Sequence, residues 1–266
     1  MEYGSLGRNM KHSYSKIIHE ELGYDYALIS LEPEEIDGFL TKREFKGLSV
    51  TIPYKKTVID YCDHLTPLAA EIGAVNALYF DENHQLWGTN TDYSGFLYAL
   101  DTAGISVGGK KVVILGDGAT CQTIKKAVSD RGAGELIVAS RKVTGPAVCK
   151  TGDISCLMLN YEDLAKQTDA EVIINATPVG MRPDTSGCLV DLKNFPDCKG
   201  VFDVVYNPFY TKLIKQAEDL QIPYASGLSM LVAQATVAAG YFRGKCGFYE
   251  KETERIIAKL KREFIE

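Results

Sequence analysis

The segment from residue 110 to residue 141 constrains the fold most strongly, because its pattern changes three times over a short distance. An apolar run at 111–115 (KVVIL) precedes a glycine-rich turn, a helical stretch follows, and a second apolar run occupies 135–139 (ELIVA). Both runs are apolar on both faces, which is typical of strands covered by helices on two sides. A strand, a glycine turn, a helix and a strand in this order predict a nucleotide-binding α/β unit.

The same alternation of short apolar runs and longer helical stretches continues along the rest of the chain. We expect further strands at 26–30 (YALIS), 47–51 (GLSVT), 77–80 (ALYF), 171–175 (EVIIN) and 200–205 (GVFDVV). Residues 250–264 predict an amphipathic packing helix. Its apolar face consists of Ile256, Ile257, Leu260 and Phe264. The whole pattern predicts an α/β fold with mainly parallel sheets, and 266 residues suffice for two medium domains or one large domain.

Charge and cysteine usage argue against several classes of protein. The net charge is −6, which disfavours nucleic acid as a partner. No apolar run approaches the roughly 18–20 residues that cross a bilayer, so we expect no membrane association. The seven cysteines include no CxxC pair and no zinc-like spacing to histidine, so we expect no metal site. We interpret them as free thiols of a cytoplasmic protein.

The glycine-rich turn is the first candidate binding site. Gly116 permits a tight turn out of the strand, and Gly118 lets backbone N–H groups approach a pyrophosphate. Ala119 and Thr120 follow at the start of the helix, whose N-terminus attracts an anion. Cys121 stands where the dinucleotide fingerprint has its third glycine, so the motif is incomplete. The context favours dinucleotide binding over a purely structural turn.

The end of the second strand indicates which dinucleotide binds. Sites for NAD usually carry Asp or Glu about 20 residues beyond the glycine loop. Here Ser140 is followed by Arg141 and Lys142, and no carboxylate is present. Two cations and a hydroxyl can hold a 2′-phosphate, so these residues favour NADP over NAD. The alternative is a solvated basic turn.

Seven stretches in order resemble the shikimate dehydrogenase family over essentially the whole chain. They are YGSLGRNMKHSYSKIIH, GLSVTIPYKK, IGAVNAL, GTNTDYSGF, NATPVGM, DVVYNPFYT and GLSMLVAQA. The resemblance implies a substrate-binding catalytic domain over 1–92 plus 231–266 and a Rossmann-like NADP-binding domain over 93–230. It also implies an active site in the cleft between them. The implied reaction is the reversible NADPH-dependent reduction of 3-dehydroshikimate to shikimate, in chorismate and aromatic amino acid biosynthesis.

The resemblance assigns the catalytic roles to Lys55 and Asp92. An ammonium group can donate a proton to the developing alkoxide and serve as base in the reverse direction. Asp92 would orient Lys55 and accept a hydrogen bond from a substrate hydroxyl. The full set of residues implied at the substrate is Ser13, Ser15, Thr51, Asn76, Asp92, Tyr206 and Gln234.

Several of these substrate residues have structural alternatives. Ser13 and Ser15 would bind the substrate carboxylate, but serine is also a common helix N-cap, and Ser15 could cap a helix over 16–22. Asn76 and Gln234 both donate and accept hydrogen bonds, which suits ring hydroxyls. Tyr206 could close the pocket or simply pack beneath its loop.

On the cofactor side, the resemblance adds four residues around the nicotinamide ribose and ring. They are Thr177, Val204, Gly227 and Met230. Gly227 suits a close backbone approach, and Met230 suits an adaptable apolar wall or ordinary core.

Four positions depart from the family pattern. Ser49 replaces an Asn, Lys16 a Pro, Ala119 a Gly and Ser140 an Asn. None of them alters Lys55 or Asp92, so we expect activity to survive and cofactor affinity to change most.

Two alternative functions remain open. One is a quinate/shikimate dehydrogenase that uses NAD or NADP. The other is a catalytically inactive, cofactor-sensing paralogue, although binding alone does not require the proton donor Lys55. We expect a monomer or a homodimer.

Overall fold

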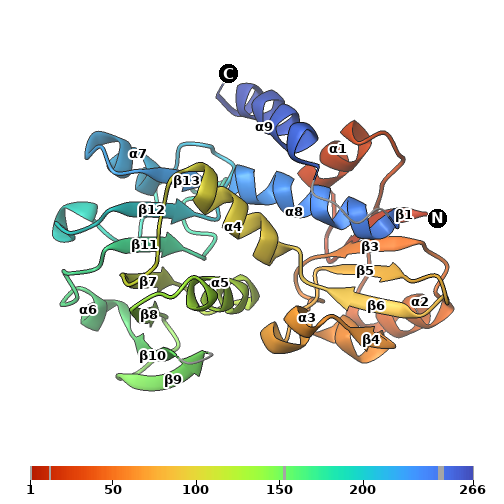
Figure 1. The fold of residues 1–266 in the computed structure, drawn as a ribbon, viewed down its shortest axis with the longest axis horizontal. Coiled ribbons are helices and arrows are strands. Elements are labelled where there is room, and N and C mark those ends of the chain that lie inside the picture. Colours follow the sequence, from red (N-terminus) through yellow and green to blue (C-terminus); the bar gives the residue numbers. More distant parts are fainter. Residues whose placement is uncertain (1, 12, 152–153, 245–248, 266) are drawn as a thin grey trace. The chain divides into compact units, whose positions relative to one another are not determined.

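The computed structural model describes residues 2–11, 13–151, 154–244 and 249–265, which form two compact units (Figure 1). The first unit comprises Met1–Gly95 and Leu231–Lys259, and the second comprises Phe96–Met230 and Leu260–Glu266. The sequence-based limits, 92/93 and 230/231, place the whole C-terminal tail in the first domain. The structural division instead assigns Leu260–Glu266 to the second unit.

The first unit is built on a six-stranded sheet with the order β2-β1-β3-β5-β6-β4. Its strands are β1 (Tyr3–Gly7), β2 (Ala27–Ser30), β3 (Gly47–Val50), β4 (His64–Leu65), β5 (Ala77–Phe80) and β6 (Leu86–Thr89). Strand β1 runs parallel to β2 and β3, and β4 runs parallel to β6, whereas β3, β5 and β6 pair antiparallel. The helical segments between them are α1 (Tyr14–Glu21), η1 (Pro33–Glu35), α2 (Ile36–Lys42), η2 (Thr57–Tyr61) and α3 (Pro67–Ile72).

Both faces of this sheet are buried. Leu48 and Val50 of β3 point to one face, where they belong to a cluster that includes Leu40 of α2. Ala77 of β5 points to the other face and clusters with Ala238 of α8 (Gly227–Phe242). The chain ends in α9 (Glu250–Ile265), which confirms the expected amphipathic helix. Ile256 and Leu260 of α9 are fully buried, while Ile257 and Phe264 are half-buried.

The second unit is built on a seven-stranded sheet with the order β13-β12-β11-β7-β8-β10-β9. Its strands are β7 (Lys111–Leu115), β8 (Glu135–Ala139), β9 (Ala147–Thr151), β10 (Ile154–Leu159), β11 (Val172–Asn175), β12 (Gly200–Asp203) and β13 (Tyr224–Ser226). All neighbours pair parallel except β9, which runs antiparallel to β10. The helical segments are α4 (Asp92–Thr102), α5 (Ala119–Asp130), α6 (Tyr161–Leu164), η3 (Leu192–Asn194) and α7 (Lys212–Asp219), with α4 beginning in the first unit.

The expected α/β class with two mainly parallel sheets is confirmed. The strands observed at 77–80, 111–115 and 135–139 have the predicted limits. The other four predicted strands are also present, but each is one or two residues shorter in the structure than predicted. Six strands were not predicted, namely β1, β4, β6, β9, β10 and β13. They are short or interrupted by glycine, serine or charged residues, so they lack a long apolar run.

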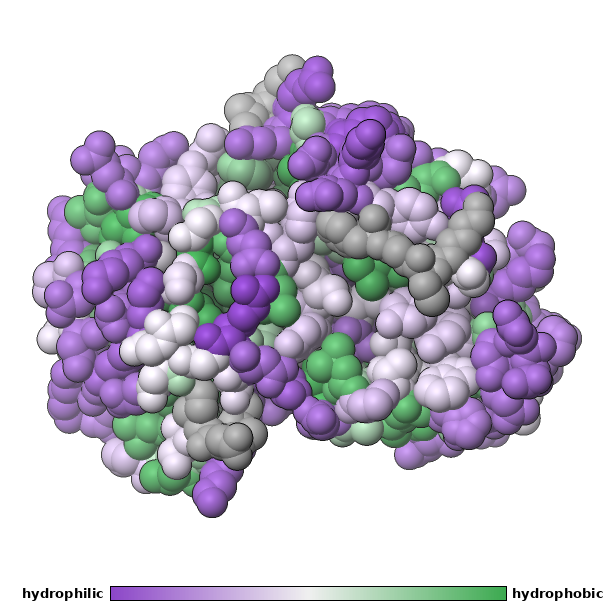
Figure 2. Space-filling view, viewed as in Figure 1, coloured by the Kyte–Doolittle hydropathy of each residue, from purple (hydrophilic) through white to green (hydrophobic). Residues whose placement is uncertain are grey.

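The surface carries few apolar features on the face drawn in Figure 2. Hydrophilic residues cover most of that face, and hydrophobic residues form small, separate patches. Within the described residues, no helix is both long enough and apolar enough to span a membrane. The six described cysteines are free thiols, and Cys246 lies outside the described residues.

Candidate active site

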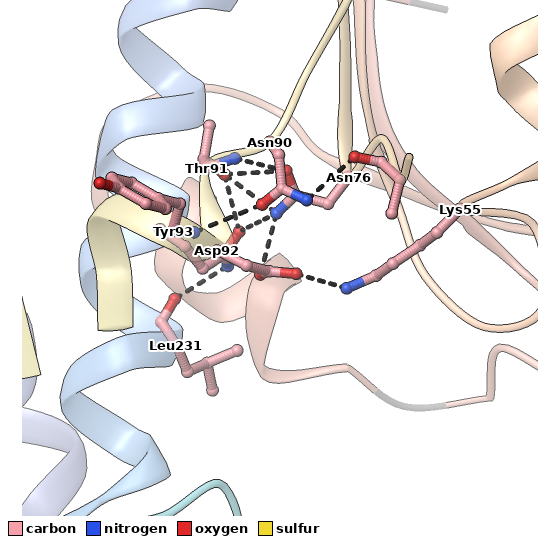
Figure 3. Close-up of polar contacts among 9 residues, drawn as sticks. Lys55, Asn76, Asn90, Thr91, Asp92, Tyr93 and Leu231 are labelled. Carbon is pink, nitrogen blue, oxygen red and sulfur yellow. Dashed lines mark hydrogen bonds and ion pairs between the residues drawn. The ribbon is translucent and has the colours of Figure 1, made fainter. Parts of the chain in front are cut away.

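Lys55 and Asp92 form a close ion pair in the first unit. Lys55 lies in the turn after β3, where its carbonyl accepts a hydrogen bond from the Val75 N–H at 2.8 Å. Asp92 is the first residue of α4, just after β6. Lys55 Nζ lies 2.5 Å from Asp92 Oδ2, and the two side chains are only 13% and 11% exposed (Figure 3). The pair is therefore largely shielded from solvent, although each side chain keeps some exposed surface.

Asn76 holds the other carboxylate oxygen of Asp92. Its Nδ2 donates to Asp92 Oδ1 at 2.9 Å, and its Oδ1 accepts the Thr91 N–H at 2.6 Å. The Asn76 Nδ2 also lies 3.3 Å from Gln234 Oε1, and Gln234 Nε2 donates to the Leu231 carbonyl at 2.9 Å. Both oxygens of Asp92 thus have fixed partners, so the carboxylate in turn fixes the Lys55 ammonium (Figure 3).

This arrangement suits proton transfer to a bound oxygen. The ammonium group supplies hydrogen-bond donors, and the adjacent carboxylate balances its positive charge. The amides of Asn76 and Gln234 are buried beside the pair. No group of three or more potential metal-binding side chains occurs among the described residues.

The structure brings four of the expected site residues together, namely Lys55, Asn76, Asp92 and Gln234. Thr91 belongs to the same network and was not predicted. It lies in the GTNTD segment, where its position between Asn90 and Asp92 was the only sequence signal.

The first unit also contains Ser13, Ser15 and Thr51, whose side chains are half-buried. Ser13 is the N-cap of α1, because its Oγ accepts the Ser15 N–H at 3.2 Å. The expected cap at Ser15 is therefore wrong by two residues, since α1 begins at Tyr14. Thr51 follows β3, and its N–H donates to the Leu6 carbonyl at 2.9 Å.

Tyr206 belongs to the second unit. Its ring packs beside Phe264 with the ring centres 6.3 Å apart. Phe264 belongs to α9, so both expected roles of Tyr206, closing the pocket and packing beneath its loop, stay predictions.

The turn after β7 contains the two glycines that the sequence singles out, Gly116 and Gly118. Gly116 has a φ of +100°, and a Cβ there would lie 2.6 Å from Thr177 Cγ2. Gly118 is the N-cap of α5, with no side chain capping the helix, and a Cβ on it would meet open space. Ala119 and Thr120 begin α5, so their N–H groups are free of intrahelical partners. These N–H groups and the helix dipole fit the anionic part of a dinucleotide.

The turn after β8 presents the expected basic pair. Ser140 is buried, and its Oγ accepts the Lys142 N–H at 3.2 Å, which shapes the turn. Arg141 and Lys142 are exposed, as a contact to a 2′-phosphate requires. Lys142 Nζ lies 3.2 Å from Asp117 Oδ1 of the glycine turn. This link was not predicted, and its only sequence signal was an acid between Gly116 and Gly118.

A second buried network ties the ends of β11 and β12 together. Asp203 is fully buried and accepts hydrogen bonds from Asn175 Nδ2 at 2.9 Å and Thr211 Oγ1 at 2.7 Å. Burial raises the pKa of Asp203 to about 6, although these hydrogen bonds oppose the shift. Asn175 Oδ1 also accepts from Thr177 Oγ1 at 2.6 Å. Thr177, expected near the nicotinamide ribose, is thereby fixed against Gly116.

Gly227 packs directly against the backbone of Val204. A Cβ on Gly227 would lie 1.9 Å from the Val204 carbonyl oxygen, so no side chain fits there. Met230, one turn along α8, is 7% exposed, which suits the expected alternative of ordinary core. Val204 is half-buried at the end of β12.

Two of the departures from the family pattern have clear structural consequences. Ser49 Oγ is buried and has no hydrogen-bond partner among the described residues, as expected for a side chain shorter than Asn. Lys16 lies in α1 and donates to the Tyr26 carbonyl at 2.8 Å, which ties α1 to the segment before β2. A proline at this position has no such donor.

Comparison with known proteins points to a single family. Residues 6–78 match the model of the shikimate dehydrogenase substrate binding domain. A shikimate dehydrogenase (NADP(+)) of Clostridium beijerinckii is 30% identical over 271 residues, covering 98% of each chain. The crystal structure of shikimate dehydrogenase 1 from Peptoclostridium difficile is 30% identical, with a TM-score of 0.86 and 99% and 98% of the chains covered. A Thermus thermophilus shikimate 5-dehydrogenase in complex with NADP(H) and shikimate is 27% identical, with a TM-score of 0.82 and coverage of 97% and 99%.

Proposed function

Because this chain belongs to the shikimate dehydrogenase family, we propose that it catalyses the reversible NADPH-dependent reduction of 3-dehydroshikimate to shikimate. The observation that carries the proposal is the shielded Lys55–Asp92 pair, with Asn76 and Gln234 beside it. A ketone reductase must deliver a proton to the oxygen that becomes an alkoxide. An oriented ammonium group in a partly desolvated site meets that need.

Lys55 is the proton donor in the reduction and the proton acceptor in the reverse direction. Its Nζ holds the proton, and the 2.5 Å contact with Asp92 keeps it in one position. The positive charge also stabilises the developing alkoxide. Asp92 orients Lys55 through Oδ2 and offers an acceptor to a substrate hydroxyl.

Asn76 and Gln234 bind the ring hydroxyls of the substrate, in addition to holding Asp92. Both amides are buried next to the ion pair, and each can donate and accept. Ser13, Ser15 and Thr51 complete the substrate site in the same unit, with the two serines at the substrate carboxylate. We also propose Tyr206 as a substrate contact, on the family resemblance alone.

The second unit binds NADP, which supplies the hydride. The uncapped start of α5, with Gly118, Ala119 and Thr120, holds the pyrophosphate. Ser140, Arg141 and Lys142 hold the 2′-phosphate that distinguishes NADP from NAD. Thr177, Val204, Gly227 and Met230 line the nicotinamide end, with Gly227 setting the position of α8 against the Val204 backbone.

The two units correspond to the two expected domains in this proposal. The first acts as the substrate-binding domain and the second as the NADP-binding domain. The free thiols of the described cysteines support a cytoplasmic location. Assembly as a monomer or a homodimer stays a prediction, which light scattering of the purified protein tests.

Steady-state rates with shikimate and with quinate, each with NADP⁺ and with NAD⁺, test the function. We expect the highest kcat/KM for shikimate with NADP⁺, because no carboxylate follows β8 to bind an NAD ribose. A higher kcat/KM for quinate or for NAD⁺ would establish the quinate/shikimate alternative. Ligand binding without turnover would establish the inactive paralogue.

A further inference from the structure

Two cysteines face each other across the β9–β10 hairpin in the second unit. In the antiparallel register, Cys149 of β9 lies directly opposite Cys156 of β10. Directly opposite residues share one face of a sheet, with Cα atoms about 4.5–5.5 Å apart. A disulfide requires a Cα separation of about 4.4–6.8 Å, so the backbone already lies within the range. The two thiols lie near enough to each other for Cys149 to perturb the ionisation of Cys156.

The two thiols differ in their surroundings. Cys156 is fully buried, because β10 lies between β8 and β9, whereas Cys149 is half-buried on β9. Burial raises the pKa of Cys156, and the neighbouring Cys149 thiol adds to the shift. Cys156 therefore keeps its proton, and Cys149 is the thiol that a small oxidant in water reaches first.

A third thiol lies close to this pair. Cys121, in the first turn of α5, is buried and lies near enough to Cys149 and Cys156 to act on them electrostatically. Burial raises the pKa of Cys121 to about 12, so Cys121, like Cys156, is not the thiol that the oxidant attacks first. Cys121 also belongs to α5, so it has no opposite residue in the β9–β10 register.

We propose that Cys149 and Cys156 form a reversible disulfide when the protein meets a hydroperoxide. The Cys149 sulfur attacks the peroxide, the O–O bond breaks, and an alcohol or water leaves with the thiol proton, so that Cys149 becomes a sulfenic acid. The Cys156 sulfur then attacks Cys149 Sγ, the S–O bond breaks, and hydroxide leaves as water with the Cys156 proton. Two thiols are oxidised and one peroxide is reduced.

The position of β9 makes the closure easy. Among the described residues, β9 is an edge strand of its sheet and pairs only with β10. It can therefore shift towards β10 without breaking hydrogen bonds to another strand. The proposal does not depend on the enzymatic function, since it rests on the hairpin alone.

Peptide mapping of the oxidised, folded protein tests this proposal. Trypsin cuts after Lys and Arg, which places Cys149 in peptide 143–150, Cys156 in peptide 151–166 and Cys121 in peptide 112–125. The protein is treated with hydrogen peroxide, free thiols are alkylated, and the digest is analysed without reductant. We expect the 143–150 and 151–166 peptides to be joined, with the loss of two hydrogen atoms, and a dithiol to separate them.

Variants define each thiol's part. Cys149→Ser and Cys156→Ser abolish the joined peptide, and Cys156→Ser leaves Cys149 as a sulfenic acid that a dimedone probe labels. Cys121→Ser leaves the joined peptide unchanged. Cys188→Ser is the matched control, because Cys188 is half-buried in the same unit and its thiol donates to the Val190 carbonyl. A disulfide that contains Cys121, or peroxide treatment that leaves Cys149 and Cys156 fully alkylated, would overturn the proposal.

Discussion

At the scale of single residues, the candidate site depends on neutral amides as much as on charges. Asn76 binds Asp92, Thr91 and Gln234 at once, and it is 3% exposed. Because Asp92 has one oxygen on Asn76 and the other on Lys55, the ammonium has a defined position before any substrate arrives. Such preorganisation is what a proton-transfer step requires.

Asp92→Asn tests this positioning directly. The substitution keeps the side-chain size and removes the charge that orients Lys55. We expect kcat for shikimate oxidation to fall about a hundredfold or more, with little change in the KM for NADP⁺. The measurement is steady-state kinetics, with Asp60→Asn as the control, because Asp60 is exposed in the same unit. An unchanged kcat in Asp92→Asn would remove Asp92 from the mechanism.

His19 makes stability depend on pH. It is fully buried, stacks on Tyr26 with ring centres 4.0 Å apart, and hydrogen-bonds Tyr24 through Nδ1. Burial lowers the pKa of His19 to about 3, below its ordinary value of 6.5. The unfolded chain therefore binds the proton more tightly, so stability is present above pH 6.5 and is lost as the pH falls.

Urea unfolding of the wild type and His19→Phe at pH 7 and pH 5 measures that dependence. Phe keeps the stacking and cannot titrate. We expect the free energy of unfolding of the wild type to drop by about 2 kcal/mol relative to the variant between these pH values. Parallel pH profiles for the two proteins would show that His19 does not titrate as its burial implies.

At the scale of elements, the strands that the sequence predicts best are those buried on both faces. The observed limits of β7 and β8 match the prediction, because their apolar runs end at glycine or polar residues. Strand β6 was missed because Gly88 interrupts it. A Cβ at Gly88 would lie 2.8 Å from Cys62 Sγ and Leu65 Cδ2, so packing requires the residue that makes the strand resemble a loop.

The link between the two turns of the dinucleotide site leads to a prediction on cofactor affinity. Asp117 of the first turn pairs with Lys142 of the second. The carboxylate of Asp117 also repels the negatively charged phosphates of NADP. Asp117→Asn would free Lys142 for the 2′-phosphate. We expect the Kd for NADP⁺, measured by calorimetry, to fall about two- to fivefold. Weaker NADP⁺ binding in this variant would mean that Asp117 shapes the site rather than opposes it.

The contact between α8 and the end of β12 requires glycine. In Gly227→Ala the new methyl group would meet the Val204 carbonyl oxygen at 1.9 Å, so the helix or the strand end must move. We expect a loss of about 1–3 kcal/mol in the free energy of unfolding. Gly145→Ala is the matched control, since a Cβ there meets nothing within 4 Å. Equal stability of the two variants in urea would contradict the packing described here.

At the scale of the whole molecule, the sequence predicts the α/β class and the dinucleotide turn from local patterns alone. It does not predict from local patterns that Lys55 meets Asp92, because the two residues are 37 positions apart, with three strands, a 3-10 helix and an α-helix between them. The family resemblance supplied that pairing, and the sheet of the first unit explains it. The Asn175–Asp203–Thr211 network had no sequence signal, since each residue alone is an ordinary polar residue at the end of an element.

The most direct test of the account is kcat for shikimate oxidation by NADP⁺ in Lys55→Ala, measured beside Lys56→Ala. Lys56 is the exposed neighbour and serves as the control for a lost lysine at this turn. We predict that Lys55→Ala lowers kcat about 10²- to 10⁴-fold, because the proton donor is gone, while Lys56→Ala stays near the wild type. A Lys55→Ala protein that keeps near-normal kcat would contradict the account.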